Sequence, residues 1–165
     1  MKKFDQIDLE ILSHLQSDAR LTTAALARKI GLSATPVAER VKALEGAGVI
    51  TAYTARFAPS KLGLGLLVFI EVAIDRTSED AVAEFKEAVL KIAEVQECHM
   101  VAGGFDYLLK VRVADMDAYR GFLSTALGKV KNIKQTHSYA VMEEVKDSFS
   151  IDLSRVFVGI DNGSR

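Results

Sequence analysis

Polar side chains whose spacing would bring them together occur between residues 33 and 44. In a helical projection, Thr35, Glu39 and Lys42 point to one side of this segment. Arg40 lies on the flank of that side. Hydroxyl, carboxylate and cationic groups on a short rigid helix can contact base edges and phosphates in a DNA major groove. The apolar positions, which share the opposite side of the helix, are Val37, Val41 and Leu44.

A helix, a short turn and a second helix are needed to hold these side chains in place. Leu26 and Ile30 recur at the spacing of a first helix, and Gly31 can end it because glycine adopts a left-handed conformation at no steric cost. Taken alone, this pattern fits a DNA-binding helix–turn–helix and an ordinary helical hairpin about equally well. The residues suited to the helix starts are Thr22 or Thr23 for the first helix, and Ser33 or Thr35, followed by Pro36, for the second.

Residues 4–17 predict another helix with an apolar face, which completes a three-helix unit. Beyond it, β-branched and alternating runs predict strands at 66–74, 95–102, 106–113 and 133–143, and helical patterns fall at 78–93 and 115–130. The order β-α-β-β-α-β is typical of a ferredoxin-like domain. The fold class is therefore α+β, with an N-terminal, winged-helix-like helix–turn–helix. The expected boundaries are 1–50 for this domain, 51–65 for an extended linker or strand, 66–147 for the ferredoxin-like domain and 148–165 for a tail.

One face of the predicted sheet has no helix to cover it. Leu67, Phe69 and Ala73 would lie on this face. Lys110 and Arg112 would join them if the strand alternation holds. A surface that is partly apolar and partly charged suits a subunit interface, so a homodimer is expected.

The composition is compatible with several partners. Residues 1–50 carry seven Lys or Arg and six Asp or Glu, out of 21 and 22 in the chain, so cations for DNA would have to be concentrated locally. No apolar run is long enough to span a membrane. A single cysteine, Cys98, excludes an internal disulfide and suits a reducing cytoplasm. We therefore expect a cytoplasmic protein.

Other chemistries have little support in the sequence. Gly63 and Gly65 precede a strand without a third glycine or a following helix, so they indicate a linker rather than a dinucleotide site. Cys98, His99 and His137 do not have the spacing of metal ligands, and a buried cysteine with partly exposed histidines is expected instead. We expect no metal, no prosthetic group and no enzymatic activity.

The chain resembles the Lrp/AsnC family, the leucine-responsive or feast/famine transcriptional regulators, over residues 4 to about 150. The family's first helix is similar to DQIDLEILSHLQSDAR, and its helix–turn–helix is similar to KIGLSATPVAERVKALEGAGVI. The family's effector domain is similar to LLVFIEV, EVQECHMVAGGFDYLLKVRV, DMDAYRGFL and YAVMEEVK. The resemblance implies a sequence-specific regulator of amino-acid metabolism genes. It also implies a small amino-acid effector, leucine or another aliphatic one, bound between homodimers that assemble into an octamer.

The resemblance also assigns residues to the two sites. The family's effector loop falls on Gly103, Gly104, Phe105, Asp106 and Tyr107, and the strand facing it on Tyr139 and Val141. Glycine N–H groups can approach a carboxylate closely, while Asp106 suits either the effector ammonium or an internal cap of the loop. The DNA-contacting residues implied are Thr35, Pro36, Glu39 and Arg40 near bases, Lys42 at a phosphate, Ser33 at the start of the recognition helix, and Arg28 as a nearby cation.

Three hypotheses remain at this point. The first is a DNA-binding regulator that responds to an amino acid. The second is an enzyme on a ferredoxin-like sheet that uses Asp106 or His137 as a base, and the helix–turn–helix argues against it. The third is an effector-independent architectural protein that wraps DNA.

Overall fold

The computed structural model describes residues 4–75 and 80–158. It forms two compact units, one comprising Met1–Arg56 with Asp147–Arg165 and the other comprising Phe57–Lys146. The C-terminal segment from Asp147 therefore packs with the N-terminal unit, although it follows the sheet domain along the chain.

Three helices make up most of the first unit: α1 (Gln6–Ser17), α2 (Thr23–Ile30) and α3 (Ala34–Gly46). Helix α1 begins two residues later than the sequence predicts, because Asp5 caps it through a reciprocal hydrogen-bond pair with Asp8. Residues 51–58 have no regular secondary structure, and a short 3₁₀ turn follows at Pro59–Leu62. The buried core of this unit consists of Ile11, Leu26, Ala27, Val37 and Leu44.

The turn between α2 and α3 follows the predicted chemistry closely. Thr22 caps α2 by accepting a hydrogen bond from the Ala25 N–H at 3.2 Å. Gly31 ends α2 with φ at 76°, in the left-handed region where glycine is favoured. Ser33 occupies the cap position of α3 without a capping bond from its side chain. Pro36 is the third residue of α3 and has no N–H, so one of the usual capping donors is absent.

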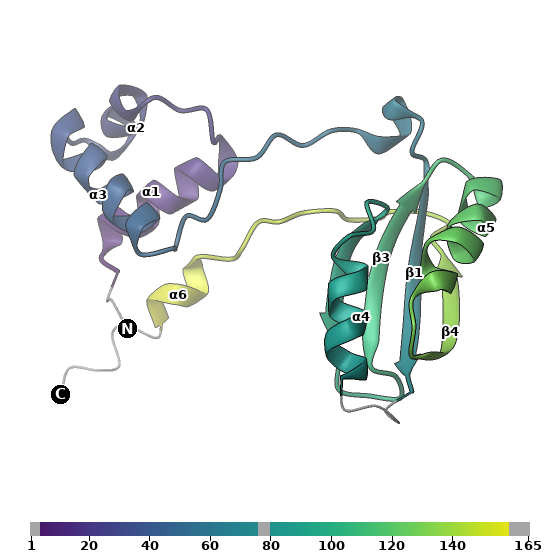
Figure 1. The fold of residues 1–165 in the computed structure, drawn as a ribbon. Coiled ribbons are helices and arrows are strands. Elements are labelled where there is room, and N and C mark those ends of the chain that lie inside the picture. Colours follow the sequence, from purple (N-terminus) through teal and green to yellow (C-terminus); the bar gives the residue numbers. More distant parts are fainter. Residues whose placement is uncertain (1–3, 76–79, 159–165) are drawn as a thin grey trace. The chain divides into compact units, whose positions relative to one another are not determined.

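A four-stranded antiparallel sheet forms the second unit, with the order β2-β3-β1-β4 expected for a ferredoxin-like domain. Helices α4 and α5 pack on one face of it (Figure 1). The strands are β1 (Leu66–Ile74), β2 (Val95–Met100), β3 (Tyr107–Val113) and β4 (Ile133–Ala140). The helices are α4 (Ala81–Val89), α5 (Met116–Thr125), a 3₁₀ turn at Leu127–Lys129 and the C-terminal α6 (Ser154–Val158).

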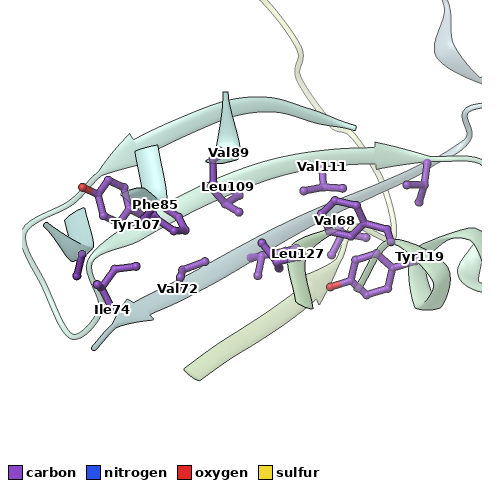
Figure 2. Close-up of a cluster of buried hydrophobic side chains, with 14 residues drawn as sticks. Val68, Val72, Ile74, Phe85, Val89, Tyr107, Leu109, Val111, Tyr119 and Leu127 are labelled. Atoms are coloured by element: carbon purple, nitrogen blue, oxygen red, sulfur yellow. The ribbon is translucent and has the colours of Figure 1, made fainter. Parts of the chain in front are cut away.

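Alternate residues of β1 and β3 build the core of the sheet unit, as the sequence alternation predicts. Val68, Val72 and Leu109 point toward the helices and meet Phe85 and Leu127 there (Figure 2). Helix α4 is shorter than the helix predicted at 78–93, and Ser78, the first residue of that predicted helix, lies outside the described residues.

Met116, the first residue of α5, is exposed. The expectation of a buried cysteine is wrong. Cys98 is exposed because β2 is an edge strand with a neighbour on one side only. It is therefore a surface thiol and not a core residue.

The sheet face opposite the helices is less open than expected at one end. The Val141 N–H donates to the Leu67 carbonyl at 2.9 Å, so pairing continues one residue past β4. Arg112 Nη2 then donates to both carboxylate oxygens of Glu144 at 2.9 and 2.8 Å. Arg112 is only 7% exposed and Leu67 is also buried. The segment after β4 thus covers the positions of Leu67 and Arg112, and the face stays open over the remaining rows.

Candidate functional site

One candidate site is the exposed side of α3. Thr35, Glu39 and Lys42 are exposed there, and Ser33 lies at the start of the same helix. Val37 and Leu44 are fully buried on the opposite side. The two faces that the helical projection predicts for α3 are therefore confirmed.

Two exposed cationic side chains lie on α2 and α3. Arg28 lies in the last turn of α2, and Lys42 lies on α3. Within residues 4–75 and 80–158, no salt bridge engages either side chain. Pro36 is half-buried at the first turn of α3. These positions leave both cations available to an anionic ligand.

Arg40 has a different environment from its neighbours on α3. Its Nη1 atom donates to Asp5 Oδ2 and to Asp8 Oδ1, both at 2.7 Å. The backbone N–H of Asp8, followed by the Arg40 guanidinium, holds the pKa of the Asp5 carboxyl below its usual range. The expected base contact of Arg40 therefore competes with an ion pair inside the unit.

A second candidate site is a pocket of about 370 Å³ on the open face of the sheet. Strand β1 contributes Glu71 and Ala73, and the loop between β2 and β3 contributes Gly104 and Phe105. Strand β4 completes the lining with Gln135 and His137. The lining thus combines a carboxylate, an amide, an imidazole and a glycine backbone with the apolar side chains of Ala73 and Phe105.

Tyr139 extends this polar group along β4. Desolvation first, and the Glu71 carboxylate second, raise the pKa of the Tyr139 hydroxyl above its usual range. Gln135 and His137 are also joined to each other, at 2.8 Å between Nε2 atoms. Tyr139 lies two residues beyond the pocket-lining His137 on β4.

The loop between β2 and β3 is held to β1 through Asp106. Its Oδ2 atom accepts from the Ile74 N–H at 2.8 Å, and its own N–H donates to the Val72 carbonyl at 2.9 Å. Of the two roles expected for Asp106, the structure displays the internal one. Gly103 is exposed beside the pocket-lining Gly104.

Two residues assigned to the effector site lie elsewhere. Tyr107 is a core residue whose ring centroid is 4.6 Å from that of Phe85 (Figure 2), because β3 alternation turns it toward the helices. Val141 follows β4 at the far end of the open face, paired to Leu67. Neither Tyr107 nor Val141 lines the pocket.

Four pocket residues were not assigned to the effector site from the sequence: Glu71, Ala73, Gln135 and His137. The signal that could have found them was strand alternation. Glu71 shares a face with Phe69, and the register pairs Glu71 with His137. The register itself depends on long-range pairing, which periodicity does not reveal.

Within residues 4–75 and 80–158, His, Cys, Asp and Glu form no group of three or more that could hold a metal ion. No helix in the same described ranges combines the length and apolar character needed to cross a membrane.

Comparison with known proteins supports both candidate sites at the level of domains. A model of winged helix–turn–helix DNA-binding domains matches residues 4–51, and a model of the Lrp/AsnC ligand-binding domain matches residues 67–151. The leucine-responsive regulatory proteins of Klebsiella pneumoniae and Escherichia coli K12 are each 48% identical over 147 residues, which cover 89% of this chain and 90% of theirs.

Solved structures of similar proteins agree with these domain matches. A transcriptional regulator from Neisseria meningitidis, determined as an L-Met complex, matches with a TM-score of 0.89 and 35% identity, covering 93% of this chain and 99% of that one. Escherichia coli AsnC matches with a TM-score of 0.81 and 25% identity, covering 88% of this chain and 97% of that one. The fold and these matches define a transcriptional regulator that joins a DNA-binding helix–turn–helix to a ligand-binding sheet domain. Within that class, the chain belongs to the Lrp/AsnC family.

Proposed function

We propose that the protein binds an inverted-repeat DNA site through the exposed side of α3 and changes this binding when an amino acid enters the sheet pocket. The observation that carries the proposal is the presence of an exposed polar helix face in one unit and a polar pocket in the other. Genes of amino-acid metabolism are the targets that this sensing would serve.

The DNA contacts proposed for α3 follow from its side-chain chemistry. Glu39 can accept from cytosine N4, and Thr35 can bond to several bases in the major groove. Ser33 and Pro36 lie at the end of α3 that enters such a groove first. Lys42 and Arg28 would contact phosphates, which provide affinity without sequence information.

An amino-acid zwitterion fits the chemistry of the pocket. The Glu71 carboxylate can accept from the ammonium group, and the N–H groups near Gly103 and Gly104 can donate to the carboxylate. Phe105 and Ala73 offer apolar contact to a side chain. Leucine or another aliphatic amino acid is the proposed effector, and relatives named leucine-responsive support this choice. Methionine is the second candidate, because the Neisseria regulator was determined with L-Met.

The proposed assembly is a homodimer that associates further into an octamer. Support comes from the open sheet face, where Phe69, Lys110 and Tyr139 remain without a covering helix. A two-fold dimer presents two copies of α3 and so matches an inverted repeat. The protein would act by binding and assembly in the cytoplasm, without catalysis and without a prosthetic group.

Two measurements test the proposal. Titration calorimetry with each of the twenty amino acids identifies the effector, and a mobility-shift assay with and without it measures the response. We expect heat with an aliphatic amino acid and an altered shift at saturating effector. Absence of heat with every amino acid, alongside normal DNA binding, would favour the alternative of an effector-independent architectural protein that wraps DNA.

A further inference from the structure

A single guanidinium nitrogen joins the DNA-facing helix α3 to the start of α1. Arg40 Nη1 lies 2.7 Å from Asp5 Oδ2 and 2.7 Å from Asp8 Oδ1. These carboxylates are 35 and 32 residues away along the chain, so the contact is tertiary. We propose that Arg40 is a positioning residue for DNA binding, which holds α3 at a fixed rotation against α1 and does not itself contact the bases. The proposal rests on the DNA-facing side of α3 proposed above.

Each of the four oxygens of the Asp5 and Asp8 carboxylates has a hydrogen-bond partner. Asp5 Oδ1 accepts from the Asp8 N–H at 2.9 Å, while Asp8 Oδ2 accepts from the Asp5 N–H at 3.4 Å. This reciprocal pair caps α1, and the remaining oxygen of each carboxylate faces Arg40. Each acidic side chain therefore serves the helix start and the ion pair at once.

The ion pair between Arg40 and Asp8 is partly buried. The Asp8 side chain is 13% exposed and that of Arg40 is 32% exposed. Charge-assisted hydrogen bonds in such partly buried settings are stronger than those on open surfaces. Without Arg40, two carboxylates would face one another across the cap with no cation between them. The contact thus favours one orientation of α3 over others.

The position of Arg40 on α3 makes this orientation relevant to DNA. It directly follows Glu39 and lies two residues before Lys42, on the flank between the exposed and buried sides. Val37 and Leu44 pack the buried side of α3 through apolar contacts, which are non-directional. The ion pair supplies the directional contact that apolar packing lacks.

A positioning role and a base or phosphate contact predict different results for variants of the acidic partners. Asp8→Asn keeps an oxygen for the cap but removes the charge that holds Arg40. If Arg40 positions α3, Asp8→Asn must weaken DNA binding although Asp8 itself touches no DNA. If Arg40 contacts DNA, Asp8→Asn should leave binding unchanged or tighten it, because a competing acid has been neutralised.

The test is a double-mutant cycle on DNA affinity with the full-length protein. The probe is a duplex selected by the wild-type protein from a random pool, and a scrambled duplex is the comparison. We expect Arg40→Gln and Asp8→Asn each to weaken binding to the selected duplex about threefold to tenfold, and the double variant to be no weaker than either. Binding to the scrambled duplex should stay within twofold. A loss from partial unfolding would instead weaken both duplexes equally.

Salt dependence and rescue complete the test. We expect the slope of log affinity against log salt to be unchanged in Arg40→Gln, and Arg40→Lys to recover most of the affinity because an ammonium can bridge both carboxylates. Lys42→Ala is the control for the DNA-facing side and should lower the slope by about one unit. A slope lowered by one in Arg40→Gln, together with a neutral Asp8→Asn, would overturn the proposal. If Lys42→Ala and Thr35→Ala leave DNA binding intact, the proposed DNA-facing side of α3 fails instead.

Discussion

At the scale of single residues, the open sheet face contains a small charge cluster. Lys110 Nζ donates to Glu97 Oε1 at 2.9 Å, and His99 Nε2 lies 3.1 Å from Glu97 Oε2. Lys110 first, and His99 second, hold the pKa of Glu97 below its usual range. Burial opposes this shift only in part.

This cluster predicts a pH dependence of stability. A carboxyl whose pKa is lower in the folded state stabilises the fold above its unfolded value of about 4.3, and the contribution is lost as pH falls through the folded pKa. Glu97→Gln should therefore flatten the decline in unfolding free energy below about pH 4.3, with a cost of about 0.2–1 kcal/mol at pH 7. Urea unfolding between pH 3 and 7 measures this. Glu87→Gln is the control because Glu87 makes no ion pair within the described residues.

Two substitutions of Asp106 should distinguish its effect on stability from its effect on the effector response. Removing its Oδ2 leaves the Ile74 N–H without that acceptor, so Asp106→Ala should destabilise the sheet unit by about 1–3 kcal/mol and weaken the effector response. Asp106→Asn retains an acceptor oxygen and should restore stability. Thermal unfolding and effector calorimetry on both variants check this. An Asp106→Asn variant that is stable but does not bind the effector would indicate that the Asp106 carboxylate contacts the effector ammonium group.

At the scale of elements, substitution of two glycines, one inside α5 and one just after it, should change stability in opposite directions. A Cβ on Gly128 would lie 2.6 Å from the Leu123 carbonyl oxygen, whereas a Cβ on Gly121 meets nothing within 4 Å. Gly128→Ala should destabilise the protein by about 1–3 kcal/mol. Gly121→Ala, inside the helix, should stabilise it by about 0.5–1 kcal/mol. Differential scanning calorimetry of the two variants gives the sign, and equal shifts would contradict the geometry.

The C-terminal segment returns to the three-helix unit through specific contacts. Gln16 Nε2 donates to the Ile151 carbonyl at 3.0 Å, and the Ile151 N–H donates to Gln16 Oε1 at 2.8 Å. Arg56 pairs with Asp147, and its guanidinium lies 4.8 Å from the Phe149 ring centroid. The C-terminal tail is therefore held by α1 and by the chain just before the sheet unit.

Release of this segment can be measured by proteolysis. Gln16→Ala removes two exposed hydrogen bonds worth about 0.5 kcal/mol each, so chymotryptic cleavage after Phe149 should speed up about fivefold. Gln6→Ala is the control, because the Gln6 side chain donates to Glu10 within its own helix. Mass spectrometry of the fragments over time measures both rates. Equal rates would show that Gln16 does not hold the segment.

At the scale of the whole molecule, the open sheet face predicts the oligomeric state. Tyr139 on this face and Met116 on α5 are both 52% exposed, so they are equally accessible in the monomer. Tyr139→Asp should dissociate the dimer because it places a charge in the proposed interface. Met116→Asp should leave the mass unchanged. Sedimentation equilibrium at micromolar concentration distinguishes them, and a Tyr139→Asp variant of wild-type mass would move the interface elsewhere.

The sequence by itself determined the elements, their order and their faces. The left-handed Gly31, the Thr22 cap and the alternation along β1 and β3 are set by contacts within a few residues, which local pattern rules describe. The same rules placed Thr35, Glu39 and Lys42 on the exposed side of α3.

Tertiary structure alone decided which distant groups meet. Arg40 forms ion pairs with Asp5 and Asp8, and Arg112 forms one with Glu144. Glu71 and His137 line the same pocket. Each of these contacts joins residues more than thirty positions apart, so helical or strand periodicity contains no information about them. They depend on sheet register and helix docking, which only the packed core establishes.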